Sequence, residues 1–114
     1  MPRLASFLAL AAALGAAPAL AQTAAARDLF VQRDKGHCIA CHQLPEGAGP
    51  ASRADLGPRL EGARMRALGR ARLREVIEDP MKSNPDSLMP PYGRHRLLDR
   101  AEIERLVEFL HGLP

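Results

Sequence analysis

The sequence predicts a small all-α fold. No segment alternates apolar and polar residues as a strand does, whereas several segments repeat apolar residues at helical spacing. The segments between them are rich in Gly, Pro and Ser, which is loop composition. These observations predict three to five short helices joined by long loops.

Residues 1–21 have the features of a cleaved signal peptide. Arg3 is the only charge in the first 26 residues, and a short apolar run leads to a small-residue cleavage site that ends at Ala21. The unbroken run is shorter than the about 20 residues that span a bilayer. We therefore expect export to the periplasm, with no membrane span after cleavage, and one domain over residues 22–114. A retained N-terminal anchor is the alternative.

A domain of this size usually needs help to be stable, because a short chain buries only about two-thirds of its unfolded surface. The sequence contains no Trp, and its aromatic residues outside the signal are Phe30, Tyr92 and Phe109. So few aromatic side chains fill little of a core. We therefore expect a bound group to complete it.

Three segments predict helices. Residues 24–33 contain helix formers and are followed by Gly36. Residues 70–79 place apolar side chains on one face and stop at Pro80. The third helix begins with a capping box at Asp99 and Glu102 and continues with Ile103, Leu106, Val107 and Leu110 at helical spacing.

Two segments predict loops. Residues 43–58 are rich in Gly, Pro, Ala and Ser. Residues 82–93 contain three prolines, which exclude a helix or a central strand.

The charge pattern gives little reason to expect a nucleic-acid partner. Without Arg3, 15 basic residues face 13 acidic ones, a formal charge of only +2. Six arginines lie within residues 59–74. We interpret them as a solvated helix face, with Arg74 paired to Glu78 at i, i+4. The alternative is a docking face or a set of partners for the carboxylates of a cofactor.

Residues 38–42 carry the clearest chemistry. Cys38, Cys41 and His42 form C-x-x-C-H, the attachment sequence of c-type haem. Two cysteines three residues apart on a helical turn lie about 5–6 Å apart on one face. That spacing suits two vinyl groups on one edge of a porphyrin, and the next residue can place its imidazole on the iron. We predict one covalently bound haem c with His42 as an iron ligand.

The two cysteines have three other interpretations. A thioredoxin-like pair needs a βαβ setting, and no strand is predicted. A zinc site needs two further ligands, and the candidates His37, His95 and His111 have unsuitable spacing. A structural disulfide is compatible with export.

The sixth iron ligand decides what the haem does. A Met thioether raises the reduction potential and favours electron transfer over oxygen chemistry. Met89 heads the proline-rich segment and is the predicted ligand, while Met81 and His95 remain alternatives. We expect Met65 to pack in the core.

A ligating histidine normally donates its other ring nitrogen to a fixed acceptor. The Gly57-Pro58 pair could supply one, because the carbonyl of Pro58 can accept and Gly57 permits close approach of the backbone. The alternative is that the pair only ends the loop.

The order of these motifs resembles that of class I cytochromes c: C-x-x-C-H near the mature N-terminus, then Gly-Pro-x-Leu, then a late Met-Pro. More narrowly, the chain looks like the SoxX family, the monohaem subunits of the SoxAX cytochromes of bacterial thiosulfate oxidation. The segments that carry this resemblance are DKGHCIACH (34–42), LGPRL (56–60), NPDSLMPPYG (84–93) and LLDRAEI (97–103). His37 departs from it, because Asn is expected before the first cysteine.

The resemblance implies a class I cytochrome c fold around one covalently bound haem. It also implies a heterodimer with a SoxA-like cytochrome subunit that carries the catalytic haem of an L-cysteine S-thiosulfotransferase. This chain would take the electrons released when thiosulfate is joined to a carrier-protein cysteine and pass them to a soluble cytochrome c. It would hold no catalytic residue of its own. The alternative is a free-standing class I cytochrome c that shuttles electrons.

Overall fold

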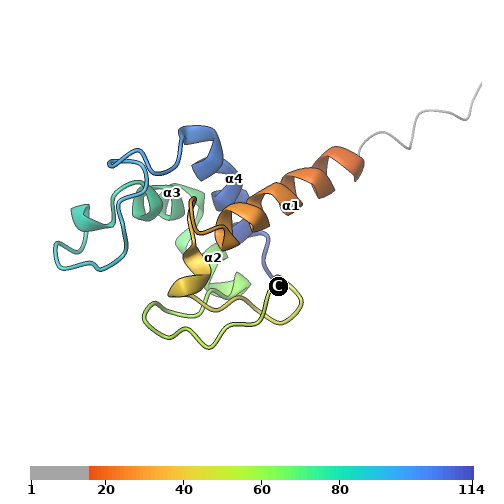
Figure 1. Cartoon of the computed structure of the whole chain (residues 1–114), viewed down its shortest axis with the longest axis horizontal. Helices are drawn as coiled ribbons and strands as arrows, with labels where there is room; N and C mark the ends of the chain where they lie inside the picture. Colours follow the sequence, from red (N-terminus) through yellow and green to blue (C-terminus); the bar gives the residue numbers. More distant parts are fainter. Residues whose placement is uncertain (1–15) are drawn as a thin grey trace, which may run out of the picture.

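The computed structural model describes residues 16–114, and its regular structure there is entirely helical (Figure 1). In this range no helix is both long and apolar enough to cross a membrane. The prediction of an all-α fold is confirmed. The helices are α1 (Ala16–Val31), α2 (Gly62–Leu68), α3 (Arg70–Glu78) and α4 (Arg100–His111), with short 3₁₀ turns η1 (Cys38–Ala40) and η2 (Pro80–Lys82).

Helix α1 begins earlier than predicted and runs across the expected cleavage site at Ala21. Its residues from 18 to 25 are exposed, and its packed residues Ala26, Leu29 and Phe30 all follow. Cleavage after Ala21 would therefore remove no described core residue. Residues 1–15, most of the predicted signal peptide, lie outside the described part of the chain.

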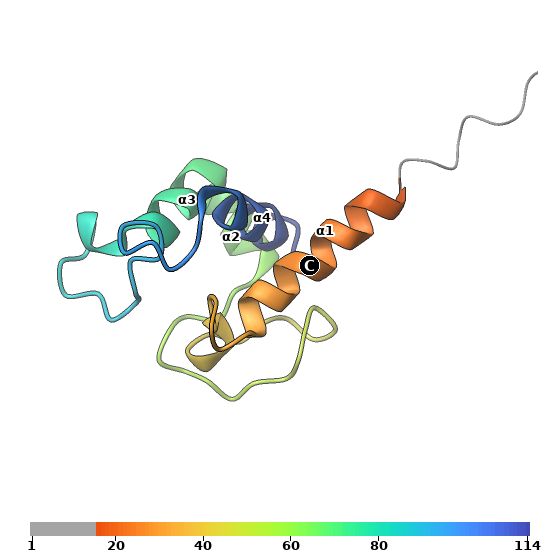
Figure 2. The same ribbon diagram turned by 45° about the horizontal axis from the view of Figure 1, so that its top comes forward.

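Helix α4 is the centre of the arrangement, because α1, α2 and α3 all pack against it. Figures 1 and 2 show α1 crossing α4, with α2 and α3 on its other side and the long 43–61 loop below. The buried side of α4 carries Ile103, Leu106, Val107 and Leu110, the four residues at the predicted helical spacing.

The capping box predicted at the start of α4 is present. The side chain of Asp99 accepts from the backbone N–H of Glu102 at 2.8 Å, and the Glu102 carboxylate accepts from the N–H of Asp99 at 2.9 Å. Glu102 also pairs with Lys35 at 2.7 Å, which ties α4 to the segment before the cysteines. The local signal thus fixes the helix start, and a tertiary ion pair uses the same carboxylate.

The α1–α4 contact is centred on Phe30, which is 1% exposed, and on Phe109, which is only partly buried. Their ring centroids are 6.2 Å apart. We expect Phe30→Ala to lower the free energy of unfolding by about 3–5 kcal/mol, the usual cost of emptying a buried aromatic site. Phe109→Ala should cost about half of that, because part of its ring already contacts water. Denaturant melts of the two variants measure this order, and an equal loss would contradict it.

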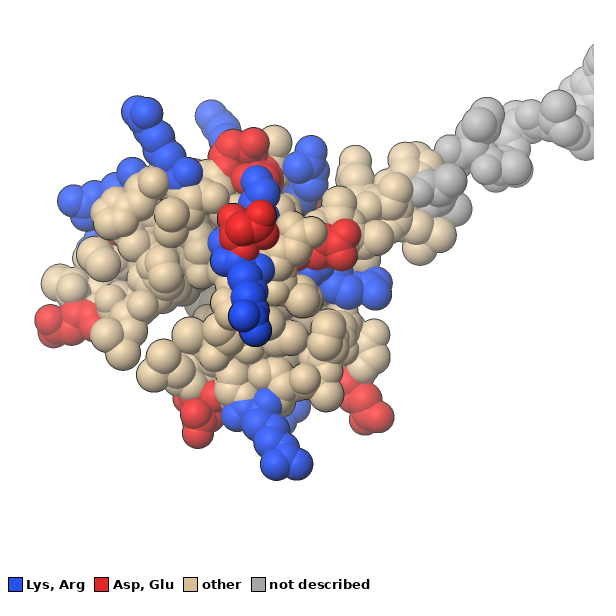
Figure 3. Space-filling model, in the orientation of Figure 1, with Lys and Arg blue, Asp and Glu red and all other residues tan. Residues whose placement is uncertain are grey.

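The seam between α3 and α4 is ionic at its surface. Arg70 donates to the carboxylate of Glu108 at 2.7 and 3.1 Å, and Arg74 makes two hydrogen bonds with Glu104. The predicted pairing of Arg74 with Glu78 is wrong, because α4 offers a carboxylate that takes both donors of the guanidinium. Figure 3 shows basic and acidic side chains next to one another over the middle of the face in view.

These pairs predict a loss of stability in acid. Hydrogen bonds from Arg74 and Arg70 lower the pKa of Glu104 and Glu108 below the ordinary value of 4.5. A carboxylate with a lowered folded-state pKa contributes its full stability above the ordinary value and loses it as the pH falls through the folded value. We therefore expect the Tm to fall below about pH 4.5. In the Glu104→Gln, Glu108→Gln double variant this fall should be shallower, and an unchanged slope would contradict the assignment.

Candidate haem site

The two cysteines and His42 lie on a single turn. The N–H groups of Cys41 and His42 both donate to the carbonyl of Cys38, at 3.1 and 2.9 Å. The turn is entered through His37, whose φ of 46° lies in the left-handed region. Non-glycine residues adopt that region seldom, and Asn, Asp and His are the most tolerant.

The two thiols occupy a partly buried, apolar setting and are not joined to each other. Burial raises the pKa of Cys38 to about 12. The thiol is therefore protonated at neutral pH, whereas redox-active and zinc-binding cysteines act as thiolates. Its environment resembles that of a structural side chain more than that of a nucleophile.

The imidazole of His42 is oriented by a backbone hydrogen-bond acceptor. Its Nδ1 lies 2.7 Å from the carbonyl oxygen of Pro58. An Nδ1–H that donates to this carbonyl leaves Nε2 with a free lone pair, as a metal ligand requires. The backbone comes so close because residue 57 is glycine: a Cβ there would lie 2.7 Å from Nδ1 and 2.9 Å from Nε2.

Hydrogen bonds hold the backbone of residues 52–60 against the attachment turn, residues 38–42. The N–H of Gly57 donates to the carbonyl of Cys41 at 2.8 Å, and the N–H of Leu60 donates to that of Gln43 at 3.0 Å. The hydroxyl of Ser52 donates to the carbonyl of Ile39 at 3.2 Å. The 43–61 loop is therefore held in place against the Nδ1 side of His42, although it has no regular structure.

A Gly57→Ala substitution tests whether the close packing of this loop against His42 is required. The new methyl group would overlap the His42 ring, so either the imidazole or the loop must move. We expect haem incorporation to fall severalfold and the Soret and visible bands of the remaining protein to change. Gly47→Ala is a control for changes in the same loop, because no atom lies within 4 Å of a Cβ there, although its φ of 82° adds strain. A normal spectrum and yield for Gly57→Ala would show that the close approach is dispensable.

One cavity brings the predicted site residues together. Its volume is about 570 Å³, within the usual range for pockets that enclose a small molecule or cofactor. The space-filling view shows a wedge-shaped opening between the 83–93 loop and the 43–61 loop (Figure 3). The predicted site residues that line the cavity are Cys38, Cys41, His42, Pro58 and Met89, and the apolar residues include Phe30, Leu60, Met65, Leu73, Val76, Ile77, Leu106 and Leu110.

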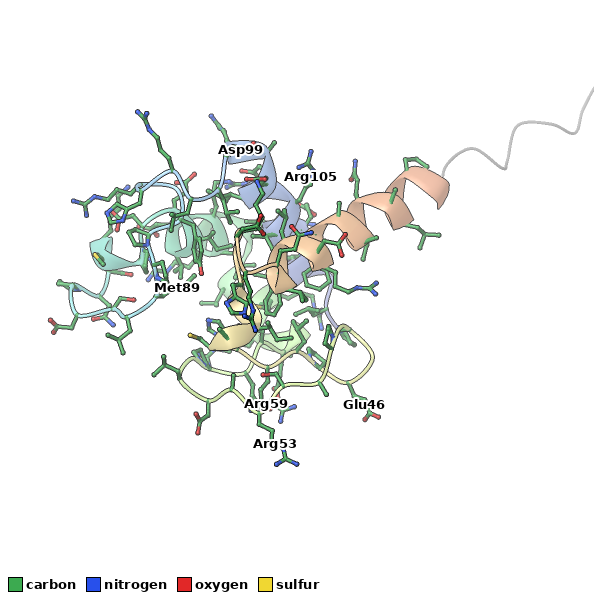
Figure 4. All side chains as sticks on the ribbon, in the orientation of Figure 1. Glu46, Arg53, Arg59, Met89, Asp99 and Arg105 are labelled. Carbon is green, nitrogen blue, oxygen red and sulfur yellow. The ribbon has the colours of Figure 1, made fainter. Side chains whose placement is uncertain are left out.

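The residues present fit a haem. The cavity is mostly apolar, as a porphyrin face requires, and its walls carry two thiols and an imidazole with a fixed acceptor behind it. A thioether sulfur is available from the 83–93 loop, where Met89 lies toward α3 (Figure 4). Met81 and His95, the other candidate ligands, do not line the cavity. Met65 is buried, as expected.

The family model described as cytochrome c oxidase, cbb3-type, subunit III, matches residues 21–110. The chain belongs to this cytochrome c family. It is therefore a class I c-type cytochrome domain, which binds haem and transfers electrons. No curated protein matches the chain.

Four of the six arginines of residues 59–74 bond to other groups of the cytochrome c domain. Beyond the two pairs on α4, Arg72 contacts Glu75 at 2.6 Å and Arg66 donates to the carbonyl of Leu113 at 2.7 Å. Of the six, Arg64 and Arg72 line the cavity. Arg64 and Arg72 are therefore the candidates for contacts with carboxylates of the cofactor, although Arg72 also pairs with Glu75.

One residue of this site has no counterpart in the predictions. Tyr92 is buried, lines the cavity and donates from its hydroxyl to the carbonyl of Gly36 at 2.5 Å. Its surroundings raise its pKa to about 12, chiefly through burial. The only signal in the sequence is its place in the Met-Pro-Pro-Tyr-Gly segment, which does not reveal a partner 56 residues away.

Proposed function

We propose that this chain is a periplasmic electron-transfer cytochrome, the SoxX-like subunit of a SoxAX-type complex. In this proposal, Cys38 and Cys41 hold haem c covalently, and His42 and Met89 are the axial ligands of the iron. The observation that carries the site assignment is that one apolar cavity is lined by all four residues, which come from two segments far apart in the chain.

The bound haem supplies a centre that takes up and releases one electron at a time. The protein residues set how this happens. The Pro58 carbonyl keeps the His42 ring in one orientation, and the apolar walls of the cavity would shield a bound haem from water. A thioether ligand favours the reduced state and leaves no open position at the iron for another substrate.

The chain has no further thiol for sulfur chemistry, because its only two cysteines are used for attachment. Thiosulfate would accordingly react on a SoxA-like partner, and this subunit would carry electrons onward to a soluble cytochrome c. The support for this finer assignment is the set of motifs at residues 34–42, 56–60 and 84–93.

The second candidate is a free-standing cytochrome c that shuttles electrons between larger complexes. It is favoured by the family match, which covers the cytochrome c domain without being specific to the SoxX family. Both candidates place the same chemistry in the cavity and differ only in whether a permanent partner is present.

The test is a pull-down of the mature protein from the periplasm of its own cells, with the affinity tag at the mature N-terminus, where α1 is exposed. We expect a second band that stains for covalent haem and elutes with the tagged chain. The purified pair should become reduced when thiosulfate and the carrier protein are added, whereas the isolated chain should not. A chain that elutes alone would favour the free shuttle.

A further inference from the structure

We propose that Tyr92 is a positioning residue for the sulfur of Met89. Its hydroxyl group links the haem-attachment segment, residues 36–42, to the ligand loop, residues 83–93. The inference rests on the proposed ligation by Met89. In this role Tyr92 binds neither the iron nor a substrate.

The Gly36 carbonyl, which accepts the hydrogen bond from Tyr92, is held rigidly. Gly36 is buried, and its N–H donates to the carbonyl of Leu29 at 3.1 Å, at the end of α1. A Cβ at this position would lie 2.7 Å from that carbonyl oxygen and 3.0 Å from the sulfur of Cys38. The Gly36 carbonyl that receives the tyrosine hydroxyl is therefore fixed relative to the first attachment cysteine.

The backbone around Tyr92 is fixed as well. Its N–H donates to the carbonyl of Ile77 at 3.2 Å, and the N–H groups of Gly93 and Arg94 donate to that of Glu78 at 3.1 and 3.0 Å. These bonds satisfy carbonyls at the end of α3, which an α-helix leaves without partners. The phenol thus joins two anchored elements, α3 and the attachment segment.

Only Pro90 and Pro91 separate Tyr92 from Met89. A proline ring restricts φ to about −65°, so two in succession make a stiff spacer. A fixed Tyr92 therefore restricts the positions that the backbone of Met89 can adopt.

On the other side of Met89, the ligand loop is bonded to η2 only at its start, where the N–H groups of Ser83 and Asn84 donate to the carbonyl of Pro80 at 3.3 and 3.1 Å. The N–H of Met89 donates to the hydroxyl of Ser87 at 3.2 Å, and the N–H groups of Asp86 and Ser87 both donate to Asn84. None of these later contacts reaches another element. Along the chain, the nearest hydrogen bond to another element is therefore at Tyr92, three residues from Met89, whereas on the other side it is at Asn84, five residues away.

The experiment measures how readily imidazole displaces the sulfur from the ferric iron in the complete haem-loaded protein. Tyr92→Phe keeps the ring and removes the hydroxyl. We expect imidazole to bind about tenfold more tightly, corresponding to about 1.4 kcal/mol, which is the size expected for one buried hydrogen bond. A Pro90→Gly, Pro91→Gly variant keeps the hydroxyl and loosens the spacer, and it should show a comparable gain.

Combining the changes completes a double-mutant cycle. If Tyr92 acts through the spacer, Tyr92→Phe should have little further effect in the Gly-Gly background. Additive effects would overturn this route. The control is Phe109→Leu, which weakens the α1–α4 contact at a side chain that does not line the cavity: it should lower the Tm and leave the imidazole affinity unchanged.

Two failures can be told apart. A wild-type protein without the near-infrared band of thioether-to-iron ligation would overturn the ligation by Met89 and this inference with it. An intact band with the same imidazole affinity in wild type and Tyr92→Phe would overturn the role of Tyr92 alone.

Discussion

The Cys38→Ala, Cys41→Ala double variant should lose all covalently bound haem and be largely unfolded. Without the two thioether bonds the cofactor can dissociate and leave the cavity of about 570 Å³ to water or void. At about 24 cal/mol per Å³ for a dry void, the cost is at most on the order of 10 kcal/mol, and water that enters through the opening lowers it. This is comparable with the whole stability of a small domain, about 5–15 kcal/mol.

The measurements are haem staining on denaturing gels and far-ultraviolet circular dichroism after expression with a cytochrome c maturation system. Each single Cys→Ala variant should keep some stain through its remaining thioether. Met81→Ala is the control, because that side chain does not line the cavity. Retained stain in the double variant would refute covalent attachment through these cysteines.

Met89→Ala should abolish the weak near-infrared charge-transfer band and lower the reduction potential. The thioether stabilises ferrous iron more than water or histidine does, so its loss favours the ferric state. The structure supports this choice of ligand, because Met89 lines the cavity and Met81 and His95 do not.

The matched variants are Met81→Ala and Met65→Ala, in which the band should remain. Met65→Ala should instead lower the stability by about 2–5 kcal/mol, because Met65 is buried in the core. A band that survives in Met89→Ala and disappears in Met81→Ala would transfer the ligand to Met81. A wild type without the band would reopen the assignment to electron transfer through a thioether-ligated iron.

Helices α3 and α4 could be predicted because their signals are local. Pro80 ends α3, and the capping box of Asp99 and Glu102 begins α4. Helix α2 could not. It has seven residues and starts at Gly62, whose N–H donates to the carbonyl of Pro114. That contact is tertiary, and helical spacing in the sequence carries no trace of it.

The site divides in the same way. The C-x-x-C-H motif is contiguous, so attachment and the proximal ligand could be predicted from it. The choice among Met81, Met89 and His95 depends on the path of a loop that is set by contacts with α3 and Gly36. The partner of Arg74 was missed for a related reason, since a bidentate carboxylate across the helix seam competes successfully with one a turn away.

The central place of α4 has a consequence for the order of biosynthesis. Each of the other three helices packs on α4, which is the last of them to be translated. At about 5–20 residues per second, Cys41 leaves the ribosome's catalytic centre roughly 3–14 s before Leu110 does. Until then the core cannot close over the attachment turn. A chain that still lacks α4 therefore leaves the two thiols accessible, and the packed core forms only when the last helix is present.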